Sequence, residues 1–333
     1  MSQISMKALA QLAGVSVATV SKALQDKDDI GEETKKRIQE LAREHNYAPN
    51  HIARSLRIRT TNVLGVLIPD NSDLYFARII KGIEDVARKN DYAVIVLNTN
   101  ESSEEEQECI STLKGLMVAG ILSVPIDISN YRNVGIPVML LARLPRGGDP
   151  HDMHYVVNDD YKGAYMATEH LIESGFEQIF FVNGPKNIMA SDSRMKGYRG
   201  ALEAGGIKFD SSKVLPGHTT MEDGFNALEK VMKLADTEQP LGILCFTDYI
   251  AIGVLAALKT RETAEGGQIR VVGYDDLELL NYILPPISSV KQARYQMGVM
   301  GTEILLGIIV NSEKEGFTSR HHITLEPQLV VRG

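Results

Sequence analysis

Residues 13–24 read AGVSVATVSKAL, and this stretch together with its flanks indicates a small helical module. Just before it, apolar residues recur at helical spacing from 6 to 13 and give a short helix with one apolar face. Gly14 is expected to end that helix, because glycine adopts the left-handed conformation easily. Ser16 then offers an N-cap hydroxyl to a second helix over 17–25. Two short helices joined by Gly-Val-Ser form a helix-turn-helix pattern.

A third amphipathic helix is predicted over 32–46, and its apolar residues would close a core of three-helix size. The outward side of the second helix carries Val17, Ala18, Ser21 and Lys22. A recognition helix offers such side chains to base edges in the major groove of DNA. An ordinary helical hairpin is the alternative interpretation of the same pattern. The segment that follows decides between the two.

That segment reads NYAPNHIARSLR at 46–57, and NVLGVLIPD follows at 62–70. The succession closely resembles the lactose/galactose-repressor family of bacterial transcriptional regulators, and the resemblance extends over essentially the whole chain. In that family the residues after the Pro-Asn pair become a short hinge helix on operator binding, and a leucine from it enters the minor groove. The resemblance therefore implies further DNA contacts at Ser16, Thr34, Tyr47, Asn50, Arg54, Ser55 and Leu56, with Leu56 as the wedge.

Elementary physical chemistry agrees with a hinge over 49–61. Pro49 begins a helix well, and the three arginines that follow supply charge for phosphates. An inserted leucine bends DNA onto more protein surface, which repays the cost of unstacking the bases. The alternative is that Leu56 packs against the core domain. Because so short a segment is not stably helical alone, its order can be switched.

The charge of the chain is unevenly distributed. The net charge is −8, yet residues 1–60 hold 10 Lys and Arg against 7 Asp and Glu. A basic head on an acidic body suggests that only the head meets a polyanion. Cys109 and Cys245 lie in apolar or helix-like contexts without CxxC spacing and are expected to be reduced core residues. Neither a leader pattern nor an apolar run of membrane length is present, which predicts a cytoplasmic protein without membrane contact.

From Val63 onward, apolar runs alternate with amphipathic helix-like stretches, from VLGVLIP at 63–69 to IRVVGYDD at 269–276. Alternating units of this kind imply parallel sheets that helices cover on both faces. We therefore expect an α/β fold: an N-terminal three-helix helix-turn-helix domain plus a two-lobed, periplasmic-binding-protein-like core of two doubly wound parallel sheets with a cleft between them.

The expected domain boundaries follow from this division. The DNA-binding domain would span 1–48, the hinge helix and linker 49–61, and the effector-binding and dimerisation core 62–333. Within the core, the first lobe would take about 62–161 and 292–322, and the second lobe about 162–291 and 323–333.

Ligands of such sheets bind beyond the carboxyl ends of strands, so polar residues that follow the apolar runs are the candidates. Four such groups, at 70–76, 191–194, 247–248 and 275–276, would converge on the cleft. The family places its effector there, and the predicted contacts are Tyr75, Phe76, Asn158, Arg194, Thr247, Asp248 and Asp275. The alternatives are an interdomain ion pair for Arg194 or Asp275, core packing for the two aromatics, and helix capping for Asp248.

An arginine with carboxylates and an aromatic wall is a hydroxyl-binding set, because the guanidinium donates in a planar fork and each carboxylate accepts two hydroxyls. A sugar, a sugar acid or a nucleobase derivative fits. The chain departs from the family's usual residues at Thr247-Asp248, Asn158-Asp159 and Ala142-Arg143, so the effector of the commonest members does not transfer. Tyr-Phe-Ala at 75–77 keeps a nucleobase-responsive repressor as the alternative.

The chain contains no G-x-S-x-G, GxxxxGK[ST], GxGxxG or HExxH motif, so neither an enzyme nor a cofactor is predicted. The pairs His151/His154 and His321/His322 lack further ligands at suitable spacing, so no metal site is expected. The expected partners are a pseudo-palindromic double-stranded operator, a small polar effector and a second copy of the chain. A dimer is expected because no leucine heptad follows the core.

Two other classes of protein remain open. A solute-binding protein of the periplasmic type shares the two-lobed core, and binding to DNA would exclude it. An enzyme with an α/β core and a regulatory helix-turn-helix would turn over its ligand.

Overall fold

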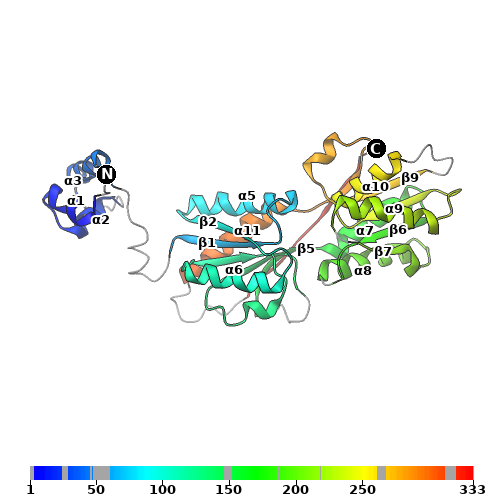
Figure 1. Cartoon of the computed structure of the whole chain (residues 1–333), viewed down its shortest axis with the longest axis horizontal. Helices are drawn as coiled ribbons and strands as arrows, with labels where there is room; N and C mark the ends of the chain where they lie inside the picture. Colours follow the sequence, from blue (N-terminus) through cyan, green and yellow to red (C-terminus); the bar gives the residue numbers. More distant parts are fainter. Residues whose placement is uncertain are drawn as a thin grey trace. The chain divides into compact units, whose positions relative to one another are not determined.

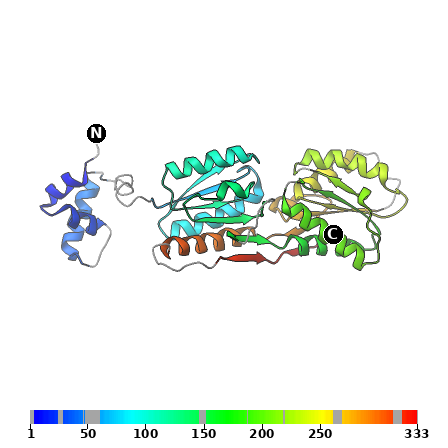
Figure 2. The same cartoon turned by 90° about the horizontal axis from the view of Figure 1, so that it is seen from below.

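The computed structural model describes residues 4–24, 29–45, 47, 61–145, 152–186, 188–217, 219–260, 268–311 and 320–332. The chain separates into two compact units, Met1–Thr61 and Asn62–Gly333. The first unit is the small helical module, and the second contains two sheets (Figures 1 and 2). Within the described ranges, no helix combines the length and the apolar character needed to cross a membrane.

The first unit contains three short helices, α1 (Met6–Ala13), α2 (Val17–Leu24) and α3 (Glu32–Glu44). Gly14 ends α1 with a φ of 65°, the left-handed conformation predicted for it. The Ser16 hydroxyl accepts a hydrogen bond at 3.1 Å from the amide three residues further on, so the predicted N-cap of α2 is confirmed. Leu9, Val20 and Ile38 contribute one fully buried side chain from each helix. The helix-turn-helix module is therefore confirmed.

The first lobe of the second unit is built on a sheet in the order β11-β5-β4-β3-β1-β2, and all its neighbouring strands run parallel. Its strands are β1 (Val63–Ile68), β2 (Ala93–Asn98), β3 (Gly120–Ser123), β4 (Val138–Ala142), β5 (His154–Asn158) and β11 (His322–Leu325). Helices α5 (Leu74–Lys89) and α11 (Arg294–Asn311) pack on each other and cover one face (Figures 1 and 2). Helix α6 (Ser103–Gly115) covers the other face, and the 3-10 helix η1 (Ile128–Tyr131) follows β3.

The second lobe has a sheet in the order β12-β10-β9-β8-β6-β7, in which only the pair β10–β12 is antiparallel. Its strands are β6 (Gln178–Asn183), β7 (Val214–Pro216), β8 (Leu241–Cys245), β9 (Ile269–Asp275), β10 (Ser288–Lys291) and β12 (Gln328–Val330). Helices α7 (Asp160–Glu173) and α8 (Met189–Ala204) pack together, as do α9 (Met221–Leu234) and α10 (Asp248–Thr260). Two 3-10 helices, η3 (Ser211–Lys213) and η4 (Glu278–Tyr282), complete the lobe. The expected pair of doubly wound sheets is confirmed.

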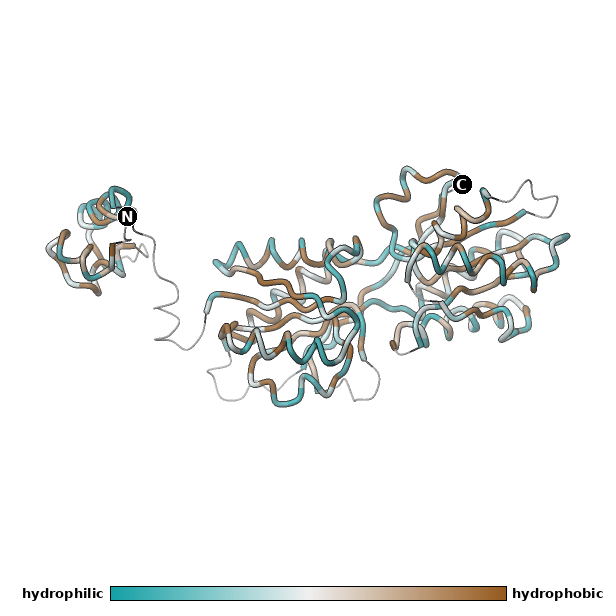
Figure 3. The backbone as a smooth tube through the Cα atoms, in the orientation of Figure 1, coloured by the Kyte–Doolittle hydropathy of each residue, from teal (hydrophilic) through white to brown (hydrophobic). Residues whose placement is uncertain are grey.

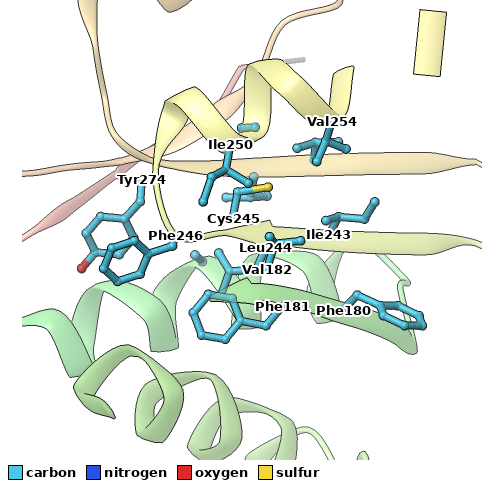
Figure 4. Close-up of a cluster of buried hydrophobic side chains, with 14 of the residues drawn as sticks. Phe180, Phe181, Val182, Ile243, Leu244, Cys245, Phe246, Ile250, Val254 and Tyr274 are labelled. Carbon is cyan, nitrogen blue, oxygen red and sulfur yellow. The ribbon is translucent and has the colours of Figure 1, made fainter. Parts of the chain in front are cut away.

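The inner strands of each sheet are buried because they are apolar on both faces. Hydrophobic segments of the tube in Figure 3 run along the strands of both lobes. In the second lobe, Phe180 and Phe181 of β6, Leu244 of β8 and Ile250 of α10 belong to one cluster of buried side chains (Figure 4). Cys245 lies in this core with no exposed surface, and neither it nor Cys109 is in a disulfide.

The chain crosses between the lobes three times, and one crossing differs from the expected position. The second lobe was expected to begin again at 323, but Ile323 and Leu325 belong to β11, which pairs with β5 in the first sheet. Both side chains pack against the core of the first lobe, and this packing holds the strand there. The last crossing therefore lies between Leu325 and Gln328.

Helices α5 and α11 cross closely at two glycines. A Cβ at Gly298 would lie 2.2 Å from the carbonyl oxygen of Ile79, and one at Gly82 would lie 2.3 Å from the carbonyl oxygen of Tyr295. Because backbone atoms cannot move aside as a side chain can, Gly298→Ala should lower the free energy of unfolding by about 1–3 kcal/mol in urea denaturation.

Gly307→Ala on the same helix provides the matched control. A Cβ at Gly307 has no atom within 4 Å, so this substitution should raise the free energy of unfolding by up to about 1 kcal/mol through helix propensity. Equal effects of the two substitutions would contradict a close helix crossing at Gly298.

Candidate functional site

The DNA-contact residues predicted on α2 lie on the surface of the helical module. Ser16, Val17, Ala18 and Lys22 are exposed, whereas Ser21 and, on α3, Thr34 are half-buried. The opposite side of α2 is buried in the module's core through Val20 and Ala23. The helix therefore presents an outward face that combines polar side chains with Val17 and Ala18, as a recognition helix can.

Lys22 forms an ion pair with Asp29 that the sequence did not reveal. The two side chains are 51% and 55% exposed, so water screens the attraction between them. An exposed pair of this kind contributes at most about 1 kcal/mol. Its contribution is small enough for a DNA phosphate or base edge to replace Asp29.

The other predicted DNA contacts are placed only in part. Tyr47 is half-buried and packs against the helical core, and its amide donates to the carbonyl of Ala42 at 2.8 Å. Burial also raises the pKa of its phenol. The hinge contacts Asn50, Arg54, Ser55 and Leu56 lie outside the described residues.

In the second unit, a buried amide joins the two lobes. Gln292 lies between β10 of the second lobe and α11 of the first, and it is 4% exposed. Its Oε1 accepts from the Tyr75 hydroxyl at 3.1 Å and from Nδ2 of Asn158 at 2.5 Å, both in the first lobe. Its Nε2 donates to Oδ1 of Asp275, in the second lobe, at 2.6 Å. Three of the predicted effector contacts are therefore connected through a residue that was not predicted.

Arg194, predicted as a ligand contact, is held firmly by its own lobe. Its Nε donates to Oδ1 of Asp160 at 2.8 Å, and its Nη1 donates to the carbonyl of Phe246 at 2.5 Å. The guanidinium carbon lies 3.5 Å from the ring centroid of Tyr274 and 4.2 Å from that of Phe246. Nη2 has no hydrogen-bond partner among the described residues. Nη2 of the guanidinium thus remains available, while the rest of the group is fixed.

The turn that carries Asp275 has strained backbone. Asp275 has a φ of 113° and Asp276 a φ of 52°, and Ala142, at the end of β4, has a φ of 66°. Non-glycine residues in such conformations cost on the order of 1–3 kcal/mol each and concentrate at functional sites. Oδ2 of Asp275 accepts no hydrogen bond from any described residue, which leaves one of its oxygens for a ligand.

Asp248 supports this turn from behind. It is fully buried; its Oδ2 accepts from the amide of Leu277 at 2.7 Å, and its Oδ1 accepts from the Ser289 hydroxyl at 2.6 Å. Both oxygens are therefore engaged within the second lobe. Asp248 follows a strand end, as the sequence rule requires, but its carboxylate is directed at the neighbouring turn.

Two further predicted contacts also have partners within their own lobes. The Thr247 hydroxyl accepts from the amide of Ile250 at 3.3 Å and donates to the carbonyl of Thr219 at 3.4 Å, so it caps α10. Phe76 is 9% exposed and packs in the core of the first lobe. Tyr75 lies edge-on to it, with ring centroids 5.1 Å apart. Of the two aromatics, Tyr75 reaches the polar network and Phe76 supports it.

Burial dominates the electrostatics of the network. It raises the pKa of Asp275 well above the ordinary range, against the opposing effect of Arg194. It also raises the pKa of Asp160, and Arg194 again opposes the shift. Desolvated carboxylates of this kind favour a partner that donates hydrogen bonds.

Further contacts join the lobes around this network. The amide of Leu74 donates to the Tyr249 hydroxyl at 3.2 Å, and Arg78 pairs with Glu278 at 3.1 Å. Arg294, at the start of α11, donates to the carbonyl of Asp276 at 2.8 Å. Pro145 and Ile188 form an isolated β-bridge. The network is thus enclosed by contacts that a relative movement of the lobes would break.

The sequence did not point to Asp160, Phe246, Tyr274, Gln292 or Arg294. Gln292 and Asp160 follow the strands β10 and β5, so the rule of polar residues after strand ends would have found them had those short strands been recognised. Phe246 and Tyr274 looked like ordinary strand residues. No group of three or more His, Cys, Asp or Glu residues suited to a metal ion occurs in the part of the chain that the structure describes.

Comparison with known proteins adds independent findings. Residues 5–50 match the family model for bacterial regulatory proteins of the lacI family. Residues 61–326 match the model for periplasmic binding proteins and the sugar-binding domain of the LacI family. The second match alone covers well over half of the chain.

Relatives and a solved structure are similar over nearly the whole length. The transcriptional regulator RegA of Clostridium saccharobutylicum is 30% identical, with 98% of each chain covered. The transcriptional repressor PurR of Aliivibrio fischeri strain MJ11 is 27% identical, over 98% of this chain and 97% of the relative. A structure of the transcriptional regulator CelR with cellobiose has a TM-score of 0.73 at 26% identity and covers 99% of each chain.

Asp248 should make folding stability depend on pH. Burial raises its pKa to about 7 in the folded state, whereas an unfolded aspartate titrates near 4. The folded state therefore holds a proton that the unfolded state has lost between about pH 4 and 7, and stability falls as the pH rises through this window. The free energy of unfolding of the wild type, relative to Asp248→Asn, should increase by on the order of a few kcal/mol from pH 8 to pH 5. Parallel pH profiles of the two proteins would contradict this assignment.

Proposed function

We propose that this chain, which belongs to the LacI family of bacterial regulatory proteins and is a ligand-controlled DNA-binding regulator, is a cytoplasmic repressor. It binds a pseudo-palindromic operator as a homodimer and responds to a small hydroxylated effector. The observation that carries the proposal is the Gln292 amide, which hydrogen-bonds to both lobes at the predicted effector position. A ligand that displaces this amide or adds to it changes how the lobes are held together.

The proposed effector contacts are Tyr75, Asn158, Arg194 and Asp275, with Phe76, Thr247 and Asp248 as supporting residues. The available atoms are Nη2 of Arg194 and one carboxylate oxygen each of Asp160 and Asp275. One donor group between two acceptors suits a ligand whose hydroxyls donate to the carboxylates while another oxygen accepts from arginine. A sugar has this pattern on adjacent carbons, and the CelR structure holds one.

The second candidate is a nucleobase-responsive repressor. Its support is the similarity to the PurR proteins together with the Tyr75-Phe76 pair. A purine offers one or two hydrogen-bond donors and a flat ring, so a Tyr75→Leu substitution would weaken its binding more than it weakens binding of a sugar.

The proposed DNA-binding mechanism uses the exposed face of α2 for bases and residues 49–61 as a hinge, with Leu56 as the wedge. Arg54 and its neighbours would contact phosphates, and Asn50 and Ser55 would contact the backbone near the wedge. The acidic remainder of the chain supports restricting DNA contact to the N-terminal head.

The proposed dimer surface lies around η4 in the second lobe. Tyr282 is 86% exposed and Leu284 is 72% exposed, which is unusual for two such large apolar side chains so close together. Beside them lies a cavity of about 380 Å³ whose lining includes Leu255, Leu258 and Pro285. On a two-fold axis, the projecting residues of one copy meet the hollow of the other, which makes the surface self-complementary.

A thermal-shift screen of the full chain against sugars, sugar derivatives and purines tests the effector proposal. Effector at a hundred times its dissociation constant should add about 2.7 kcal/mol to the free energy of unfolding. Asp275→Asn should weaken that ligand about tenfold or more, because the amide oxygen is used by Gln292 and an N–H group would then face the ligand hydroxyl in place of an acceptor. Asp210→Asn, an exposed carboxylate in another part of the lobe, should leave the affinity unchanged. Absence of any stabilising ligand from these classes would refute a hydroxylated or nucleobase effector.

Sedimentation velocity tests the dimer. Tyr282→Asp should shift the protein from the mass of a dimer to that of a monomer, because a charge at the centre of an apolar interface is left unpaired. Phe225→Asp serves as the control, since Phe225 is another exposed aromatic of the same lobe, 43% exposed on α9. The dimer surface is wrong if the two variants sediment alike.

A further inference from the structure

We propose that Asp160 is a specificity-determining residue that makes the effector site selective for uncharged ligands and excludes phosphorylated and carboxylated ones. The inference rests on the proposed function of the interlobe network as an effector site, and it specifies the chemical class of the ligand. Asp160 does so by cancelling the charge of Arg194, the cation that would otherwise attract an anion.

The two groups form a buried ion pair within the second lobe. Nε of Arg194 lies 2.8 Å from Oδ1 of Asp160, and the two side chains are only 7% and 11% exposed. The Tyr274 hydroxyl lies 3.4 Å from the same oxygen. Because Asp160 is the first residue of α7 and Arg194 lies within α8, two helices that pack on each other, the pair is held in fixed register. A ligand therefore meets Arg194 and Asp160 together.

The arginine retains its directional donors although its charge is balanced. The Phe246 carbonyl and two aromatic rings fix the plane of the guanidinium. Nη2 remains available to a ligand oxygen, and Oδ2 of Asp160 has no partner among the described residues. One ligand hydroxyl can accept from Nη2 of Arg194 and another can donate to Oδ2 of Asp160, whereas a carboxylate or a fully ionised phosphate ester can only accept.

The surrounding charges point in the same direction. Besides Arg194, the cation Arg294 acts electrostatically on Asp275, and its side chain donates to the Asp276 carbonyl. Asp275 and Asp73 add acidic groups to Asp160; both act electrostatically on the Tyr249 hydroxyl, and Asp73 also acts on Asp275. The site thus holds at least as many acidic groups as basic ones. An anionic ligand would be brought close to carboxylates in a region from which water is largely excluded, where repulsion is strong.

A purely structural role is the competing interpretation, in which the pair only joins α7 to α8. The two roles differ in what happens when the charge of Asp160 is removed and its shape retained. A structural pair would lose stability without any new binding. A charge-selecting residue would uncover a cation that accepts anions.

The experiment compares the full-length wild type with Asp160→Asn, using inorganic phosphate as probe in isothermal titration calorimetry and thermal-shift assays. Asparagine retains an oxygen for Nε of Arg194. Asp160→Asn should bind phosphate about tenfold or more tightly than the wild type, corresponding to about 1.4 kcal/mol. The gain should disappear in the double variant Asp160→Asn/Arg194→Gln. Asp159→Asn, which removes the neighbouring carboxylate that caps α7, should not increase phosphate binding.

The same proteins are then screened against pairs of ligands, each a neutral pentose or hexose with its phosphorylated and carboxylated counterparts. The wild type should bind only neutral members. Arg194-dependent binding of phosphate or a sugar phosphate by the wild type would overturn the inference, as would a folded Asp160→Asn protein that binds no more phosphate than the wild type. If Asp160→Asn gains phosphate binding but no sugar binds the wild type, charge selection stands and the proposed sugar effector fails.

Discussion

One buried amide, that of Gln292, connects polar side chains of both lobes of this protein. Gln292 accepts from Tyr75 and Asn158 with its oxygen and donates to Asp275 with its nitrogen. An amide suits this position because it is neutral and offers an acceptor oxygen and a donor nitrogen on one rigid group. A carboxylate there would face Asp275, and an apolar side chain would leave three buried polar groups without partners. The rest of the site is arranged around this constraint, since the Asp275 turn and the start of α5 must both reach the amide.

The strained turn at Asp275 explains why buried polar residues accumulate behind it. A φ of 113° in a non-glycine residue persists only when its surroundings hold it. Asp248 supplies two hydrogen bonds, one to Leu277 and one through Ser289, and Arg294 donates to the carbonyl of Asp276. In the same lobe, Asp160 and two rings fix Arg194. The groups proposed to bind the ligand are therefore pre-organised by the residues packed around them, which is how small molecules obtain affinity from few contacts.

The sequence predicted the architecture well because its signals are local. Gly14 and Ser16 mark the ends of two helices, and long apolar runs such as VLGVLI and QIFFVN mark buried parallel strands. The short strand β10, Ser288–Lys291, was not recognised, because its serines break the apolar pattern and bond instead to Asp248 and to the carbonyl of Arg332. Gln292 was missed for the same reason. Asp248 and Asp275 both follow strand ends, and only the fold decides that one carboxylate is directed at the neighbouring turn and the other at the opposite lobe.

The most direct test is to measure operator affinity with and without the effector, in the wild type and in Gln292→Leu. The operator is first selected from random DNA, and the effector is taken from the ligand screen. In the wild type, the effector should change operator affinity about 5- to 150-fold, the usual range of allosteric coupling. In Gln292→Leu, the effector should still bind through Arg194 and Asp275 while its influence on operator affinity largely disappears. An unchanged response in a variant that folds and binds both ligands would contradict the central role of the Gln292 amide.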